Sequence, residues 1–216
     1  LPAPREIRQP STENVIDRQK LFGYTLEDLR FLMEPMVKNG EEATGSMGTD
    51  VPLAVLSDKS HDLFNYFKQL FAQVTNPAID PIREELVMSL TSYIGTERNI
   101  LDETPQHCHT LKLPHPLLTN WDLEKLRRVS WGDFLATTLP MLFRVEGGTF
   151  ELQRSLDALC RRASLAIKSG YTLLILSDRG MDEEYAPIPS LLALTAVHNH
   201  LVREGTRTQV ALIIES

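Results

Sequence analysis

The sequence predicts an α/β fold in which a helical N-terminal part is followed by parallel strand–helix units, similar to a partial (β/α) barrel. Up to about residue 100, apolar residues recur mainly at helical spacing, whereas beyond it continuous apolar runs alternate with amphipathic segments. The order strand–helix–strand–helix–strand implies a parallel sheet with right-handed crossovers, as in (β/α) barrels. With 216 residues and 42% hydrophobic content, the chain can bury the core of one domain, with or without an appendage.

The first part of the chain carries clear helix boundaries. Residues 1–24 are expected to form a lead-in and linker, because the first twelve are rich in proline and polar side chains. A helix should begin after Thr25, which can cap it, with Asp28 at the capping-box position. Pro35 should kink or end this helix, and Gly40 should close it.

Two more helices are expected before residue 94, joined by a proline-bearing turn. Residues 61–74 repeat apolar side chains at helical spacing. After the turn, Asp80 fits the N-cap of a second helix and Pro81 fits its first position. Residues 11–94 should therefore be mainly helical. The buried stripe of the last helix is predicted to be Ile82, Leu86, Leu90 and Tyr93.

The second part changes character after residue 100. Residues 108–114 alternate weakly like a strand, and residues 120–129 form a short helix that Asn120 is expected to cap. A long helix should end at Gly170, and another at Gly205. Parallel strands are predicted near 137–145, 172–177 and 209–215.

Charge and composition exclude several classes of function. The net charge is −7, from 22 basic and 29 acidic residues, so nothing electrostatic favours nucleic acid or an anionic membrane. The pairs Arg127–Arg128 and Arg161–Arg162 are interpreted as solvated helix faces. Cys108 and Cys160 form no disulfide framework, which indicates a reducing compartment. No apolar run is long enough to span a bilayer.

Histidine and cysteine side chains invite a metal interpretation that their spacing does not support. On a strand, His107 and His109 would share a face while Cys108 points away, so only two ligands converge. On a helix, His198 and His200 diverge. The sequence also has no nucleophile-elbow pattern and no glycine-rich phosphate loop.

Two short motifs are better candidates for a site. "LSDRG" at 176–180 follows a buried strand, where parallel α/β folds place functional loops. Its Asp178 and Arg179 either grip a polar ligand or form an ion pair that shapes the loop. "GTERN" at 95–99 joins the two parts of the chain, and its charged residues are expected to serve a domain contact.

Several longer motifs carry a family resemblance that covers essentially the whole chain. "GSMGTDVPLAVLS", "YFKQLFAQVTNPAIDPIREELVMSL", "GTERNIL" and "LILSDRG" occur in this order. Together they resemble the central domain of the glutamate synthase (GOGAT) large chain. On this resemblance, residues 25–216 are a C-terminally truncated central domain, helical over about 25–100 and α/β over about 101–216. The chain begins at Leu1 without a methionine, which fits a piece of a longer polypeptide.

The resemblance implies a role in a larger enzyme, located in the cytoplasm or, in photosynthetic eukaryotes, in plastids. That family makes two L-glutamates from L-glutamine and 2-oxoglutarate, with electrons from NADPH, NADH or ferredoxin. An amidotransferase domain with a terminal cysteine nucleophile releases ammonia, and an FMN and iron–sulfur domain uses it. The central domain links these two partners and helps form the ammonia tunnel, without binding FMN. A small NADPH-oxidising subunit or ferredoxin is an implied partner; nucleic acid and membrane are not.

The chain alone is therefore expected to be inactive and to hold no FMN, iron–sulfur cluster or other metal. Residue 1 is leucine, and two separate cysteines cannot hold a cluster. A tunnel wall needs rigid backbone and few ionisable groups, which the loop at 45–49 and the turn at 75–79 offer. Candidate tunnel or domain-interface residues are Ser46, Met47, Thr49, Thr75, Asn76, Pro77, Ala78, Ile79, Thr96, Glu97, Arg98, Asn99, Asp178 and Arg179.

Two other functions remain open from the sequence. The chain can be a small (β/α) lyase or aldolase in its own right that uses Asp178 and Glu215. It can also be a purely structural module that spaces other domains, with the turn at 75–81 serving only to reverse the chain between two helices.

Overall fold

A computed structural model describes residues 1, 12–41, 56, 58, 63 and 79–216. The chain divides into two compact units, one containing Leu1 and residues 79–216 and the other containing residues 12–41. None of the helices formed by the described residues combines the length and the apolar composition needed to cross a bilayer. The helix predicted over 61–74 lies outside the described residues, apart from Leu63.

The smaller unit confirms the predicted helix start. It contains α1 (Thr12–Leu21), a π-helical turn (Asp28–Met33) and α2 (Glu34–Asn39). The Thr25 amide donates to Asp28 Oδ2 at 2.7 Å and the Asp28 amide donates to Thr25 Oγ1 at 3.2 Å, so the capping box is complete. The helix does not end at Pro35, because the wider π-helical turn precedes this residue. It ends at Gly40, which has a left-handed φ of 66°.

The larger unit begins with a short helix and a ribbon. Helix α3 (Pro81–Val87) is followed by β1 (Ser92–Ile94), which pairs antiparallel with β2 (Leu111–Leu113). The helix is thus shorter than predicted, and Tyr93 lies in a strand. The predicted buried stripe is wrong: Ile82 is 86% exposed, and Leu86, Leu90 and Tyr93 are exposed too. Helical spacing identified the apolar face, but the described part of this unit does not cover it.

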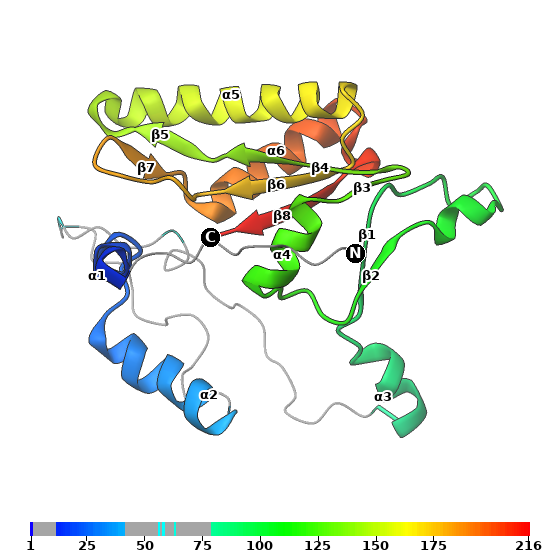
Figure 1. Cartoon of the computed structure of the whole chain (residues 1–216), viewed down its shortest axis with the longest axis horizontal. Coiled ribbons are helices and arrows are strands. Elements are labelled where there is room, and N and C mark those ends of the chain that lie inside the picture. Colours follow the sequence, from blue (N-terminus) through cyan, green and yellow to red (C-terminus); the bar gives the residue numbers. More distant parts are fainter. Residues whose placement is uncertain (2–11, 42–55, 57, 59–62, 64–78) are drawn as a thin grey trace. The chain divides into compact units, whose positions relative to one another are not determined.

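A four-stranded sheet forms the centre of the larger unit, in the order β3–β4–β6–β8 (Figure 1). Strands β4 (Phe134–Pro140), β6 (Leu173–Ser177) and β8 (Ala211–Glu215) are parallel, as predicted, and β3 (Ser130–Trp131) is antiparallel to β4. The sheet does not close into a barrel, in keeping with a partial (β/α) barrel.

The predicted strand at 137–145 is divided in two at Met141, whose side chain is fully buried. After this break, β5 (Leu142–Arg144) leaves the main sheet and pairs antiparallel with β7 (Tyr185–Pro187). This ribbon continues from the carboxyl ends of β4 and β6.

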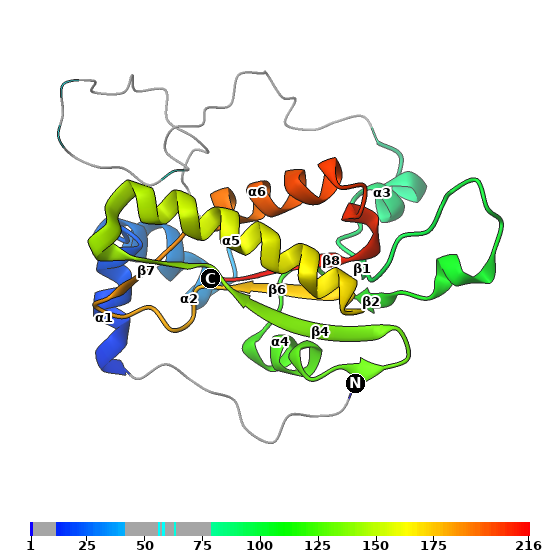
Figure 2. The same cartoon turned by 90° about the horizontal axis from the view of Figure 1, so that it is seen from above.

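Helices cover both faces of the sheet, as Figures 1 and 2 show. On one face, α5 (Gly148–Lys168) and α6 (Ser190–Arg203) pack against the side of β6 that carries Leu174 and Leu176. On the other face, α4 (Asn120–Arg127) packs against Leu173 and Ile175. Because successive side chains of β6 point to opposite faces of the sheet, they contribute to two separate cores.

Several predicted helix boundaries can be checked in this unit. The cap of α4 is Thr119 and not Asn120: Thr119 Oγ1 accepts the Asp122 amide at 3.1 Å. The end of α5 is as predicted, since Gly170 follows its last turn with a φ of 87°. In the described part of this unit, 3₁₀ turns also lie at Pro105–Cys108, Val145–Gly147 and Arg207–Gln209.

Candidate functional site

A polar cluster lies at the carboxyl edge of the parallel strands. Register places Ser177, the last residue of β6, beside Glu215 of β8. The Ser177 hydroxyl and Arg127 Nη2 both donate to Glu215 Oε2, the latter at 2.8 Å. Arg179 Nε lies 3.7 Å from Glu215 Oε1, and the Glu215 side chain is only 11% exposed. Both carboxylate oxygens of Glu215 thus face donors from the same unit.

Arg127 ties helix α4 to this cluster. Besides Glu215, its guanidinium donates to Thr138 Oγ1 of β4 and, through Nε, to Glu124 Oε2 at 3.1 Å. Arg128 donates to the other oxygen of Glu124 at 2.8 Å. The interpretation of this arginine pair as a solvated face is therefore wrong for Arg127. The i,i+3 spacing from Glu124 was the available sequence signal.

The electrostatics of the cluster keep Glu215 ionised. Burial raises the pKa of the Glu215 carboxyl, but the hydrogen bonds from Ser177 and Arg127 and the charges of Arg127 and Arg179 lower it by more. The net result is a pKa below the ordinary value. A general acid or base is most effective when its pKa lies near the working pH. Glu215 therefore stabilises structure here and is poorly placed to exchange protons in a lyase reaction.

The "LSDRG" loop is shaped by this same cluster. Asp178 is 1% exposed, and its amide donates to the Glu215 carbonyl at 3.2 Å. The Arg179 amide donates to Ser177 Oγ at 3.1 Å, while its side chain pairs with Glu215. The ion pair at this loop joins Arg179 to Glu215, and the predicted pair between Asp178 and Arg179 stays a prediction.

The "GTERN" segment contacts the 3₁₀ turn before β8 and the turn after β3. Thr96 Oγ1 donates to the Gln209 carbonyl at 3.1 Å, and the Glu97 amide donates to the Thr208 carbonyl at 2.8 Å. Arg98 Nη2 lies 3.9 Å from Asp133 Oδ2. Asn99 instead caps its own turn, because its Oδ1 accepts the Leu101 amide at 3.1 Å and its Nδ2 donates to Asp102 at 3.1 Å.

The remaining candidate residues lie mostly outside the described part of the chain. This holds for Ser46, Met47, Thr49, Thr75, Asn76, Pro77 and Ala78. Ile79 is described and half-buried, and it immediately precedes the helix cap at Asp80. The structure therefore brings Asp178 and Arg179 together with Glu215, and it places Thr96 and Glu97 in a separate contact.

His107 and His109 do not lie on a strand, so they do not share the face of a strand. His107 lies in a 3₁₀ turn, with Nε2 2.6 Å from the Asp102 carbonyl, and His109 Nδ1 lies 3.6 Å from Asp133. His198 Nδ1 accepts from Arg207 at 3.0 Å. Within the described residues, no three histidine, cysteine or carboxylate side chains gather as metal ligands.

A second polar cluster, between α5 and α6, was not predicted. Ser164 Oγ donates to Glu204 Oε2 at 2.6 Å and lies 2.8 Å from His200 Nε2. Because Glu204 Oε1 is 3.4 Å from that same ring nitrogen, the three groups do not form a relay of the Ser–His–acid kind. Nearby, burial raises the pKa of the Cys160 thiol and so favours its unreactive form.

The fold places this chain in the class of α/β domains with a mainly parallel sheet. At the carboxyl ends of the strands, where such domains commonly bind ligands, its own charged side chains pair with one another. Comparison with known proteins then identifies the family. Residues 17–216 match the glutamate synthase central domain, so the chain belongs to that family, which confirms the resemblance found in the sequence.

The relatives are much longer than this chain. It is 44% identical over its whole length to the glutamate synthase [NADPH] large chain of Bacillus subtilis, of which it spans 14%. Over 90% of the chain it is 42% identical to glutamate synthase [NADH] of Schizosaccharomyces pombe, of which it spans 9%. Over 94% of the chain it is 43% identical to the chloroplastic ferredoxin-dependent glutamate synthase of Spinacia oleracea, of which it spans 13%. The chain is thus a small part of the length of these large proteins.

Proposed function

We propose that this chain is the non-catalytic central domain of a glutamate synthase. It links a glutamine amidotransferase domain to an FMN and iron–sulfur synthase domain and helps to form the passage for ammonia between them. The parent enzyme makes two L-glutamates from L-glutamine and 2-oxoglutarate, in the cytoplasm or in plastids. FMN and the iron–sulfur cluster belong to the other domains, and the electrons come from a nicotinamide cofactor or ferredoxin.

The observation that carries this proposal is the state of the sheet's carboxyl edge. Parallel α/β enzymes bind their substrates and cofactors there. Here Glu215 uses both carboxylate oxygens on Ser177, Arg127 and Arg179. A ligand would have to displace an ionised and partly buried carboxylate. The same observation weighs against the lyase alternative, which needs Glu215 as an acid–base group.

The candidate tunnel and interface residues support the proposal through their composition. The loop at 45–49 and the turn at 75–79 carry no ionisable side chain, and an aspartate follows each of them, Asp50 and Asp80. An uncharged wall does not hold a proton source or sink that would trap ammonia as ammonium. Thr96, Glu97, Arg98 and Asn99 instead hold the segment that leads from these turns to the sheet.

The test uses the full-length enzyme with Ala78→Trp. We expect glutamine hydrolysis to continue while glutamate formation from 2-oxoglutarate falls, with ammonia released to solvent. External ammonia should restore part of the synthesis. Val202→Trp, at an exposed position of α6, controls for the added indole.

Unchanged coupling of the two half-reactions in a folded Ala78→Trp enzyme would leave only the spacer role for this turn. A lyase activity of the isolated chain that Glu215→Gln abolishes would replace the proposal altogether.

A further inference from the structure

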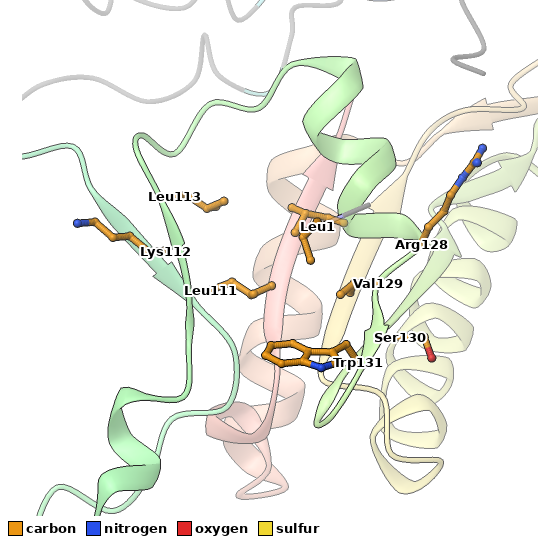
Figure 3. A pocket seen from close by; sticks show the side chains of 9 residues that line it. Leu1, Leu111, Lys112, Leu113, Arg128, Val129, Ser130 and Trp131 are labelled. Carbon is orange, nitrogen blue, oxygen red and sulfur yellow. The ribbon is translucent and has the colours of Figure 1, made fainter. Parts of the chain in front are cut away.

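Two contacts in the larger unit differ in the kind of side chain that they bring together. The groove between β2 and the segment from α4 to β3 is lined mainly by leucine, valine and tryptophan side chains and has a volume of about 560 Å³. The side chains of Lys112 and Arg128 point away from it (Figure 3). The contact between α5 and α6, in contrast, contains a hydroxyl, an imidazole and a carboxylate. Because removing polar groups from water is costly unless they are hydrogen-bonded, the bonds among these three groups decide whether the contact is stable.

Ser164 is the member of this cluster that α5 contributes, and it is 8% exposed. Helix α6 contributes His200 and also Glu204, which follows its last residue. The Ser164 hydroxyl oxygen lies 2.6 Å from Glu204 Oε2 and 2.8 Å from His200 Nε2, and a third contact, with the Cys160 carbonyl, is longer at 3.4 Å. His200 Nε2 and Glu204 Oε1 are themselves 3.4 Å apart. The hydroxyl thus bonds to two groups of the facing helix.

Counting protons orders these bonds. A serine hydroxyl has one proton to donate and can also accept, whereas a carboxylate only accepts. The 2.6 Å contact between two oxygens needs a proton, so the Ser164 proton lies on the bond to Glu204. Ser164 has then no proton for the imidazole and accepts from it. His200 therefore carries a proton on Nε2, and this same N–H faces Glu204 Oε1.

We propose that Ser164, His200 and Glu204 form a clasp that fixes the end of α6 on α5, with hydrogen bonds that run from His200 Nε2 to Ser164 and from Ser164 to Glu204. The clasp holds the end of α6 just before Gly205, after which the chain enters the 3₁₀ turn at Arg207–Gln209. The "GTERN" segment contacts this turn, so the clasp fixes one end of that contact. This inference does not depend on the proposed function.

Nitrogen–proton correlation spectra of the histidine rings test the order of the bonds. They are recorded on the 216-residue chain in mildly alkaline buffer, where a histidine ring is ordinarily neutral, and His200→Asn assigns the ring signals by their loss. The parent should show the proton on Nε2. Glu204→Ala should move it to Nδ1, because Ser164 is then free to donate to Nε2. Ser164→Ala should leave it on Nε2, because the ring can donate directly to Glu204.

A proton on Nδ1 in the parent would overturn the proposal, since Ser164 would then donate to the ring. An unchanged ring in Glu204→Ala would also overturn it, because the carboxylate would not be what orders the bonds.

Amide hydrogen exchange tests whether the clasp fixes the end of α6. Ser164→Ala removes the bonds between the two helices and leaves the His200–Glu204 pair within one of them. The amides of Glu204 and Thr206, which bond to carbonyls of the last turns of α6, should exchange about twofold to tenfold faster, as expected for the loss of a hydrogen bond. Ser155→Ala is the matched control, because it makes the same change at a half-buried position of α5 outside the clasp. Equal exchange in the two variants would overturn the proposal, and far-ultraviolet circular dichroism checks that both are folded.

Discussion

At the scale of single residues, Glu215 connects more of the larger unit than any sequence motif indicated. Its carboxylate accepts hydrogen bonds from Ser177 on β6 and from Arg127. The guanidinium of Arg127 also donates to Thr138 of β4. Arg179 approaches its other oxygen. One side chain on β8 thus joins helix α4, two further strands and the loop after β6.

Replacing this carboxylate should therefore reduce stability and change its dependence on pH. The pKa of Glu215 is lower in the folded chain than its ordinary value of 4.5, so its contribution is present above that value. It is lost as the pH falls through the folded pKa. Glu215→Gln should lower the free energy of unfolding at neutral pH by about 1–3 kcal/mol, because Arg127 and Arg179 lose a charged partner. Below the ordinary pKa the difference from the parent should shrink.

Urea unfolding at neutral and acid pH measures this effect, with Glu183→Gln as a control at an exposed carboxyl. A constant difference between Glu215→Gln and the parent across the acid range would contradict the assigned direction of the pKa.

The cap of α3 gives a second prediction at this scale. Asp80 Oδ1 accepts the amides of Ile82 and Arg83 at 3.1 and 3.0 Å, as the sequence predicted. Asp80→Ala should cost the helix about 0.5–2 kcal/mol. Because none of the residues of α3 is buried, we expect the loss as faster amide exchange within α3 more than as a lower global stability. Asp80→Asn, which keeps a capping oxygen, should preserve most of the protection. Unchanged exchange in Asp80→Ala would show that the cap contributes nothing.

At the scale of elements, the sequence predicted what depends on local chemistry and alternation. The three parallel strands, the long helix that Gly170 follows, and the Asp80 cap were all expected. The sequence did not predict features that depend on contact with a second element. The apolar spacing of Ile82 and Leu86 indicates a helix face, but not whether a partner covers it. Likewise, the contacts of Arg127 with Thr138 and Glu215 join residues far apart in sequence, which no local pattern reveals.

The packing of β1 against the sheet yields a prediction at the level of elements. Gly95 has a φ of 145°, and a Cβ there would lie 3.3 Å from Phe134 Cε1. Gly95→Ala should therefore combine backbone strain of about 1–3 kcal/mol with a side-chain clash. Gly205→Ala is the reference for a methyl group added without contacts, because no atom lies within 4 Å of its Cβ; its φ of 70° is left-handed and costs an L residue less than 145°.

Thermal unfolding should show a larger loss for Gly95→Ala than for Gly205→Ala. Equal losses would mean that the close approach to Phe134 adds nothing and that conformation alone makes glycine necessary.

At the scale of the whole molecule, the described core is confined to one unit. All buried apolar side chains among the described residues lie between Leu123 and Ile213, in two clusters on opposite faces of the sheet. Ile94 and Leu111 of the ribbon add partly buried surface to the cluster beneath α4. This distribution suits a unit that folds around its own two cores.

A chain reduced to residues 79–216 should therefore still fold. Its two cores remain intact, so we expect a single cooperative urea transition and near-native circular dichroism. The free energy of unfolding should change little, because every residue of both cores lies within the shortened chain. A chain of residues 117–216 is the informative comparison, because it also removes the β1–β2 ribbon and the contacts of Thr96 and Glu97 with the turn before β8. That deletion uncovers the core beneath α4 and should lower the transition midpoint further. If residues 79–216 showed no cooperative transition, residues 1–78 would have to supply part of the core, and the larger unit would not be an independent folding domain.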